Sequence, residues 1–340
     1  VLTDRDGLAV TFAPEQTEAL KMALSAKVSI ITGGPGVGKT TIIRALVDVF
    51  TRRNLAVSLA APTGRAAKRM EEATGQQART IHRMLKFQPR TGTFEHGPGN
   101  PMEGTIIILD EVSMIDISLM HAFDSAMKDA QCLILVGDVD QLPSVGPGNV
   151  LRDLIESNVI PCRRLETIFR QEASGLIVRN AHLINKGEAF ITPDPDTVSD
   201  FYFVESQDPE QVIQNMLDLV TRRIPEKFGF NPLTDIQVLT PMRRNQLGSE
   251  NLNALLQEKL NPSGKHILRF GRHHRIGDRV MQIRNNYDKD VFNGDIGRIA
   301  RIDDEAQELV VDYDGRPVAY AQAELDELVH AYACTIHKAQ

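Results

Sequence analysis

The feature that most constrains this chain is a glycine-rich run from Gly33 to Thr40, GGPGVGKT, which fits the spacing GxxxxGK(S/T). It follows a short apolar run, VSII at 28–31, and precedes a stretch with helical periodicity from about Thr40 to Arg53. Glycines let backbone N–H groups turn inward around phosphates, and the next helix adds the positive end of its dipole. We therefore expect a nucleotide to be bound by the loop and the first helical turn: Gly34, Pro35, Gly36, Val37, Gly38, Lys39, Thr40 and Thr41.

Two adjacent carboxylates are candidates for the chemistry at this loop. Asp110 and Glu111 follow the apolar run TIIIL at 105–109, so they would lie at the carboxyl edge of a buried strand. There Asp110 and Thr40 would hold Mg²⁺. Glu111 would orient the attacking water, and Lys39 would reach the β- and γ-phosphates. The combination predicts a nucleoside triphosphate hydrolase, and the lack of an NKxD-type sequence disfavours GTP.

Apolar runs alternate with helical patterns along most of the chain, which predicts an α/β fold with parallel sheets. Further candidates for buried strands are the runs at 56–61, 132–136 and 236–240. Two segments depart from this rhythm. The segment Lys86 to Met102 is rich in Pro, Gly and Thr and predicts a protruding hairpin. After about Lys289, short β-like runs separated by DDE and DGR turns predict a small barrel.

The distribution of charge is more informative than its sum. A net charge of -7 argues against nucleic-acid binding over the whole surface. Between Thr63 and Arg90, however, seven basic residues stand against two acidic ones, Glu71 and Glu72. Such a patch on an acidic chain fits a confined track for a polyanion, although solvated surfaces produce similar runs.

Composition narrows the class of protein. Hydrophobic residues make up 42% and charged residues 24%, as in soluble globular proteins, and no apolar stretch is long enough to span a membrane. The three cysteines form no CxxC pair, which disfavours zinc and disulfides and suits a reducing cytoplasm. We therefore expect a cytoplasmic protein.

Three further segments indicate how the energy of hydrolysis is used. In LAAPTGRAAKRM, Thr63 and Arg65 begin a basic helix that can grip the phosphates of a nucleic-acid strand. In LVGDVDQLPSVGPG, Gln141 follows an apolar strand and can sense the γ-phosphate. In RRLETIFRQ, Arg170 can stabilise charge on the transferring phosphoryl group, although a surface or ion-paired arginine is the alternative.

Taken together, the ordered segments resemble the motifs of RecD/TraA-type helicases of superfamily 1. The resemblance runs from about Phe12 to Gln340 and is carried by GGPGVGKTT, APTGRAAK, LDEVSM, GDVDQLPSVGPG, IFRQ, VLTPMRRNQLG and YACTIHKAQ. It implies two RecA-like domains with ATP between them and translocation on single-stranded DNA in the 5′ to 3′ direction. It also implies that Lys39, Asp110, Glu111, Gln141 and Arg170 are catalytic.

The resemblance assigns further residues to ligands. Gln16, in FAPEQ, is similar to the adenine-recognising glutamine of the family. The positions that resemble DNA-facing residues of the family are Thr63, Arg65, His82, Arg83, Thr240, Arg243, Thr335 and His337. Each of these residues taken alone could equally be a packed or solvated side chain.

The implied domain boundaries follow from the same motifs. We expect a first RecA-like domain over residues 1–165, with a strand-splitting hairpin inserted at 86–104. A second RecA-like domain is expected over 166–290 and 328–340, interrupted by an SH3-like barrel at 291–327. The chain ends at HKAQ, where the family pattern continues to a later arginine-bearing motif, so we expect an incomplete motor.

Two other interpretations stay open. The chain could be a DNA-stimulated translocase that does not unwind duplex, or a subunit of a larger nuclease complex. A nucleoside or metabolite kinase shares the phosphate loop but has no use for Gln141 or the segment APTGRAAK. The expected partners are single-stranded DNA and junctions of duplex with single strand, bound by a monomeric motor with a role in recombination and repair.

Overall fold

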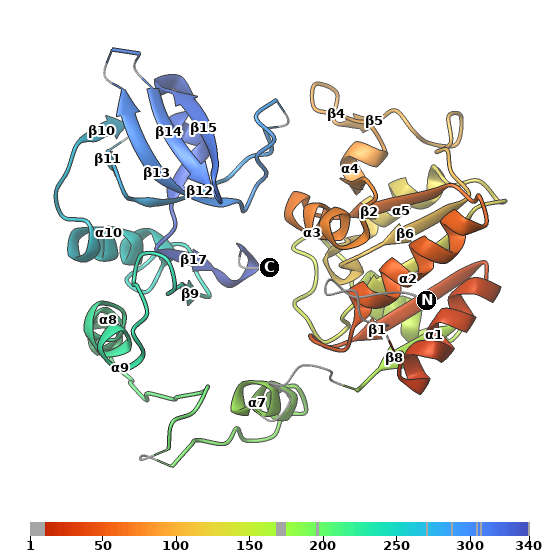
Figure 1. Cartoon of the computed structure of the whole chain (residues 1–340), viewed down its shortest axis with the longest axis horizontal. Helices are drawn as coiled ribbons and strands as arrows, with labels where there is room; N and C mark the ends of the chain where they lie inside the picture. Colours follow the sequence, from red (N-terminus) through yellow and green to blue (C-terminus); the bar gives the residue numbers. More distant parts are fainter. Residues whose placement is uncertain are drawn as a thin grey trace. The chain divides into compact units, whose positions relative to one another are not determined.

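The apolar runs at 28–31, 56–61, 105–109 and 132–136 all lie in one parallel sheet of the computed structural model (Figure 1). The structure describes residues 11–167, 175–194, 197–269, 271–286, 288–303, 305–306 and 308–338. Its contacts divide the chain into two compact units, residues 1–203 and 204–340. This division lies further along the chain than the boundary after residue 165 that the sequence predicts.

The sheet of the first unit has six strands within the described residues, and every pairing is parallel. In sheet order the strands are β3 (Ala78–Thr80), β2 (Val57–Ala61), β6 (Ile106–Leu109), β7 (Cys132–Gly137), β1 (Val28–Gly33) and β8 (Cys162–Leu165). The α/β class with a parallel sheet is therefore confirmed. The two edge strands were not among the predicted ones, because β3 is short and β8 buries only Leu165.

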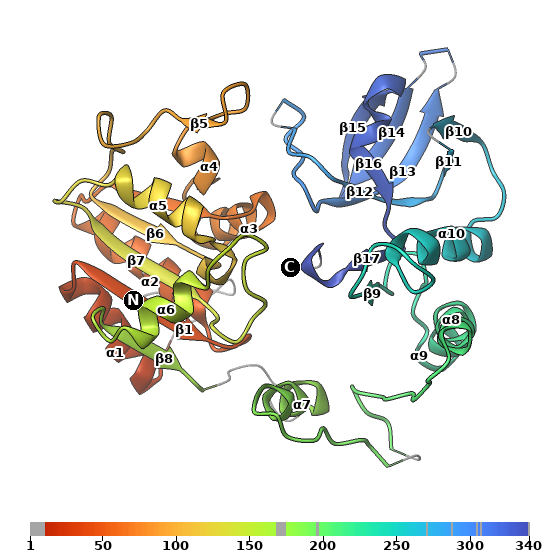
Figure 2. The same ribbon diagram turned by 180° about the vertical axis from the view of Figure 1, so that it is seen from behind.

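Helices cover both faces of this sheet (Figures 1 and 2). One face packs against α1 (Pro14–Ser25), α2 (Lys39–Arg52) and α3 (Gly64–Thr74). The other packs against α4 (Ile81–Met84), the turn Val112–Met114, α5 (Ile117–Ser125) and α6 (Val150–Glu156). Strands with apolar side chains on both faces are typical of a sheet enclosed by helices.

The predicted hairpin is present. Strands β4 (Phe87–Gln88) and β5 (Thr93–Phe94) pair antiparallel, with Phe87 opposite Phe94. In Figure 1 the hairpin projects beyond α4, away from the sheet. The first unit also includes α7 (Leu176–Asn185), whose Asn180 side chain is buried and bonds the backbone of Ile191 through both amide atoms.

The second unit contains a small α/β part. Strands β9 (Val238–Thr240) and β17 (Ala333–Thr335) pair in parallel although they are far apart in the sequence. Their core is completed by α8 (Pro209–Asp218) and α10 (Ser249–Leu260). The remaining helical pieces of this unit are Leu219–Arg223, α9 (Ile224–Phe228), Gln322–Glu327 and Ile336–Lys338.

The predicted barrel corresponds to an antiparallel sheet with the order β15-β14-β13-β12-β16. Its strands are β12 (Arg279–Gln282), β13 (Ile296–Asp303), β14 (Glu308–Tyr313), β15 (Arg316–Ala321) and β16 (Leu328–His330). The three predicted runs form β13 to β15, whereas β12 and β16 fall outside 291–327. A separate hairpin, β10 (His266–Arg269) with β11 (Arg272–Arg275), precedes the sheet.

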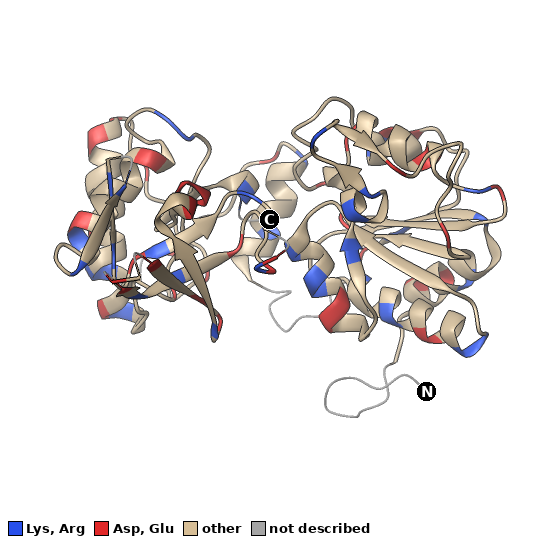
Figure 3. Ribbon diagram, turned by 90° about the horizontal axis from the view of Figure 1, so that it is seen from above, with Lys and Arg blue, Asp and Glu red and all other residues tan. Residues whose placement is uncertain are grey.

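The ribbon in Figure 3 is coloured at basic and acidic residues, which are interspersed through both units, in keeping with the modest net charge of -7. Among the described residues, no helix combines the length and the apolar character needed to cross a membrane.

One buried carboxylate joins this antiparallel sheet to α10. Asp278 precedes β12 and is fully buried. Its oxygens accept hydrogen bonds from five groups: Gln257 Nε2 (2.6 Å), Asn261 Nδ2 (2.7 Å), the Arg275 backbone N–H (2.7 Å), the Tyr332 hydroxyl (2.8 Å) and His330 Nε2 (3.2 Å). Burial alone would raise the pKa of Asp278, but these bonds outweigh it and lower the pKa below its usual value.

We predict that Asp278→Ala destabilises the second unit by about 3 kcal/mol or more, because several buried donors lose their acceptor together. Since the pKa of Asp278 is lowered on folding, this stabilisation is present above the ordinary carboxylate pKa and is lost as the pH falls. Thermal unfolding followed by circular dichroism measures the effect. The control is Asp288→Ala at an exposed position, and equal melting temperatures for the two variants would contradict the prediction.

Candidate functional site

The phosphate loop lies between β1 and α2, as predicted. Gly36 and Gly38 have φ angles of 79° and 84°, a left-handed conformation that glycine adopts without strain. At Gly38 a side chain would also collide with Gln16, because a Cβ atom there would lie 2.5 Å from Gln16 Nε2. The loop therefore needs glycine at this position for two independent reasons.

Lys39 begins α2 and reaches back across the loop. Its Nζ donates hydrogen bonds to the carbonyl oxygens of Gly33, at 2.6 Å, and Gly34, at 2.9 Å. These bonds hold the lysine ammonium at the mouth of the loop, where a bound phosphate would compete for it. Thr40 and Thr41 follow in the first turn of the helix, and Thr40 is exposed.

Gln16 lies against the same loop from α1 and is 4% exposed. Its Nε2 donates to the Val37 carbonyl at 3.0 Å, and its Oε1 accepts from the Ala13 backbone N–H at 3.1 Å. Both amide groups are thus engaged with backbone. Gln16 shapes the loop directly, and a contact with adenine would require it to exchange one of these bonds.

Asp110 and Glu111 follow β6 and lie near the lysine of the loop. Burial, together with the negative charge of Glu111, raises the pKa of Asp110 from 3.8 to about 6, while a hydrogen bond from the Glu111 backbone N–H (2.9 Å) and the charge of Lys39 oppose the shift. Burial also raises the pKa of Glu111. Glu111 Oε2 is buried without a hydrogen-bond partner, which makes it an acceptor available to a water molecule.

Asp138 is a residue at this edge that the sequence motifs did not single out. It follows β7, is 2% exposed, and contributes to the raised pKa of Glu111. Its carbonyl oxygen accepts from the Gln141 backbone N–H at 3.2 Å, so it also fixes the start of the loop that carries Gln141. The sequence signal that could have identified Asp138 was the pair of aspartates in GDVDQ. The second aspartate of the pair, Asp140, has a different role, because it forms an ion pair with Arg164.

These residues fit a nucleotide with Mg²⁺. Two half-buried carboxylates of raised pKa lie near a lysine, and a cation would relieve the repulsion between them. Magnesium at phosphate sites takes most of its ligands from water and phosphate oxygens. Accordingly, no cluster of three or more His, Cys, Asp or Glu side chains is needed, and none is found among the described residues. Arg170 lies outside the described residues.

The predicted DNA-facing residues of the first unit have different surroundings. Thr63 caps α3, and its hydroxyl accepts from the Ala66 backbone N–H at 3.2 Å. Arg65 is half-buried on the first turn of the same helix. His82 is half-buried against the aromatic side chains of the hairpin. Arg83, the next residue, is exposed.

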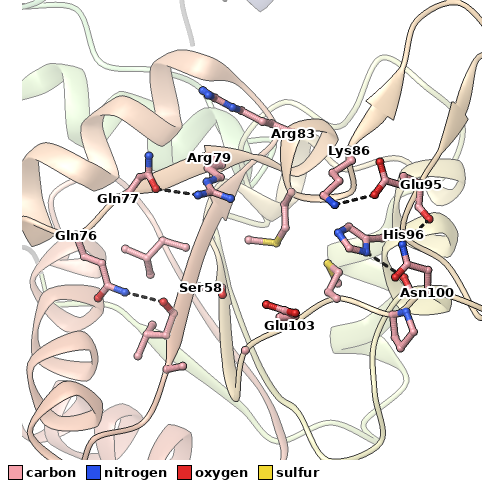
Figure 4. A pocket seen from close by; sticks show the side chains of 17 residues that line it. Ser58, Gln76, Gln77, Arg79, Arg83, Lys86, Glu95, His96, Asn100 and Glu103 are labelled. Atoms are coloured by element: carbon pink, nitrogen blue, oxygen red, sulfur yellow. Dashed lines mark hydrogen bonds and ion pairs between the residues drawn. The ribbon is translucent and has the colours of Figure 1, made fainter.

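Arg83 lines a pocket of about 640 Å³ beside β2 and the foot of the hairpin. Figure 4 shows Arg79, Arg83 and Lys86 along its upper side and Glu103 on the lower side. Lys86 pairs with Glu95 at 2.7 Å. The pocket therefore carries several residues of the basic cluster that the sequence indicates between Thr63 and Arg90.

Thr240, in the second unit, is 3% exposed, and its hydroxyl donates to the Leu247 carbonyl at 2.6 Å, so its side chain shapes the loop that follows β9. Arg243 forms an exposed ion pair with Glu250 at 2.8 Å and lines a pocket of about 320 Å³ together with Thr335. His337 is exposed.

We predict that Asp110→Asn stabilises the first unit at neutral pH. Folding raises the pKa of Asp110 from 3.8 to about 6. The contribution of Asp110 to the free energy of unfolding is therefore fully present below pH 3.8 and is lost as the pH rises through 6. The neutral amide avoids this loss, which amounts to about 3 kcal/mol. The melting temperature of the variant should exceed that of the wild type at pH 7.5. The difference should be roughly half as large at pH 5.

The control for this measurement is Asp48→Asn, which changes an exposed carboxylate on α2 that pairs with Arg52 at 2.9 Å. Ion pairs on the protein surface contribute little to the free energy of unfolding, so the melting temperature of this variant should be close to that of the wild type. A stabilisation of Asp110→Asn that does not vary with pH would show that the raised pKa is not its cause.

Comparison with protein-family models matches two segments of the chain. Residues 16–147 match an AAA domain. Residues 252–313 match the SH3 domain of ATP-dependent RecD-like DNA helicases. The first segment contains the phosphate loop, both carboxylates and Gln141. The second begins before the predicted barrel and includes most of α10 and β10 to β12.

Among solved structures, the fold is similar to that of the Pif1 helicase from Bacteroides in complex with ADP-AlF3 and ssDNA, with a TM-score of 0.59. The match covers 98% of this chain and 84% of that one, and the 18% sequence identity limits the likeness to the fold. It confirms the predicted α/β fold class.

Curated relatives agree with these matches. The ATP-dependent RecD2 DNA helicase of Deinococcus radiodurans is 35% identical over 326 residues, which is 96% of this chain and 43% of that protein. The RecBCD enzyme subunit RecD of Mycolicibacterium smegmatis is 29% identical, over 96% of this chain and 63% of that protein. The chain thus spans about half the length of these relatives. Through these matches the chain is similar to the RecD-like helicases over most of its length.

Proposed function

We propose that this chain is the motor of an ATP-dependent DNA helicase that moves on single-stranded DNA, in the 5′ to 3′ direction, and unwinds duplex. The observation that carries the proposal is the arrangement around the phosphate loop. Lys39 lies at the mouth of the loop, and the buried, unsatisfied Glu111 Oε2 lies within the field of its charge. A chain with this site and an SH3 domain of the RecD-like type fits a DNA motor better than another ATPase.

In the proposed reaction, the ammonium of Lys39 leaves the carbonyls of Gly33 and Gly34 and binds the β- and γ-phosphates. Mg²⁺, held by Thr40 and Asp110, would neutralise charge on the phosphates. Glu111 accepts a proton from the attacking water through Oε2. Gln141 senses the γ-phosphate, and Arg170 is proposed to stabilise its charge during transfer.

DNA binding is proposed for the basic surface around α3 and α4 and for the loops that follow β9 and β17. The N-terminus of α3, capped by Thr63, offers backbone N–H groups to a strand phosphate, with Arg65 on the same turn. Arg83 and Arg243 add permanent positive charge. The related Pif1 structures, one of them named for unwinding at forked dsDNA, support single strands and forks as the substrates.

Unwinding requires a device that separates the strands, and we assign this role to the β4–β5 hairpin because it projects from the first unit beside the basic residues Lys86 and Arg83 (Figure 4). A second candidate function is that of a subunit in a nuclease complex with a role in recombination and repair. The name of the relative from Mycolicibacterium smegmatis, RecBCD enzyme subunit RecD, favours it. Strand separation by the purified chain alone distinguishes an autonomous helicase from a subunit.

We predict that Lys39→Ala lowers the rate of ATP hydrolysis by ~100-fold or more, because a preorganised charge on the phosphates is lost. The fold should survive, since the side chain is only half-buried. A phosphate-release assay with single-stranded DNA present measures the rate. Lys21→Ala, an exposed lysine on α1, is the matched control, and equal rates for the two variants would exclude the assigned role.

We predict that replacing residues 87–99 by a short Gly-Ser link abolishes strand separation while ATP hydrolysis stimulated by single-stranded DNA persists. The replacement keeps Leu85 and Met102, which are buried in the sheet core, so the unit should still fold. Forked DNA with a fluorescent strand reports separation. If the variant unwinds normally, the hairpin is a surface loop and another element of the chain separates the strands.

A further inference from the structure

Three aromatic rings meet at the foot of the hairpin. The His82 ring centroid lies 5.4 Å from that of Phe87, in an edge-to-face arrangement, and 5.7 Å from that of Phe94. The two phenylalanine rings are 5.2 Å apart and belong to residues that face each other across β4 and β5. His82, on α4, therefore contacts both strands of the hairpin.

The hairpin depends on support from outside because it is small. Each strand has two residues, and a two-stranded hairpin alone is at best marginally stable in water. The ion pair of Lys86 with Glu95 is exposed and therefore contributes little to the stability of the hairpin. By contrast, Ile81 and Leu85 on either side of His82 are fully buried in the sheet core. His82 thus connects the hairpin to the rigid core of the unit.

The surroundings of His82 suit packing better than phosphate binding. Burial lowers the pKa of this histidine below its usual value, and the charge of Asp116 does not cancel the shift. A histidine of lowered pKa is neutral at pH 7 and offers no positive charge to a phosphate. The adjacent Arg83 is exposed and always charged, so it suits that contact better.

We propose that His82 is a positioning residue for strand separation, whose ring supports Phe87 and Phe94 and so holds the hairpin in the direction needed to separate the strands of a duplex. The proposal rests on the function proposed above, because it takes the hairpin to be the wedge. It replaces the direct DNA contact that motif resemblance implies for His82.

A fluorescence experiment tests the packing without reference to activity. The chain contains no tryptophan, so Phe87→Trp introduces a single reporter at the foot of the hairpin, where the 36% exposure of Phe87 leaves room for the larger ring. Adding His82→Ala should shift the emission to longer wavelength and increase quenching by iodide. Adding His82→Phe should leave both unchanged. Identical spectra for all three proteins would overturn the inference.

Activity measurements test the consequence for function. His82→Ala should lower strand separation on forked DNA roughly tenfold, which corresponds to the loss of two aromatic contacts. Its affinity for a single-stranded oligonucleotide and its DNA-stimulated ATP hydrolysis should stay at the wild-type level. His82→Phe should restore strand separation, since it keeps the ring without its nitrogens. His121→Ala, at an exposed position on α5, is the matched control.

The outcomes separate this inference from the function on which it rests. If both His82 variants bind single-stranded DNA more weakly, His82 contacts DNA and the positioning role is excluded. If His82→Ala unwinds at the wild-type rate, the ring is not needed for the wedge. If the wild type itself separates no strands, the proposed function fails, and the fluorescence result alone decides whether His82 supports the hairpin.

Discussion

The site depends on the parallel alignment of β6, β7 and β1. Leu109 pairs with Leu135 and Ile31 with Val136, so the three strands end at the same edge of the sheet. Val139, just after β7, donates to the Thr32 hydroxyl across 107 positions of sequence. Close packing of Ile, Leu and Val side chains against the helices on both faces fixes this register. The lysine, the carboxylates and the polar loop are brought together as a result.

The same edge carries groups that do not favour the folded state. Asp110 and Glu111 are half-buried and of like charge, and Glu111 has a left-handed φ of 52° without being glycine. Strained backbone conformations and buried acceptors without a hydrogen-bond partner persist where the surrounding structure holds them in place. They are concentrated at functional sites. In this unit the helices on both faces of the sheet provide that rigidity. The apolar core therefore stabilises a charge arrangement that is suited to binding a cation and phosphates.

Prediction from the sequence succeeded for local structure that is encoded in contiguous residues. The loop around Lys39, the pair Asp110 and Glu111, and the hairpin after Lys86 were all placed correctly, because their local pattern also fixes their local structure. It was less successful where a residue's role depends on distant partners. Thr240 resembled a DNA-facing position by its motif, whereas its burial and its bond to the Leu247 carbonyl could not be foreseen from the sequence. Strands β12 and β16 were missed because they lie outside the predicted barrel limits and pair with each other across a long stretch of sequence.

The start of α5 connects the nucleotide edge with the foot of the hairpin. The Ile117 backbone N–H donates to the Pro147 carbonyl at 2.9 Å, and Pro147 belongs to the loop that follows Gln141. Asp116 caps the same helix by accepting from the Leu119 N–H at 2.8 Å, and its charge acts on His82. Close-packed elements move together when one of them is displaced. The α5 terminus is thus bonded to the loop after Gln141, and the charge of Asp116 also acts on His82, the residue that contacts both strands of the hairpin.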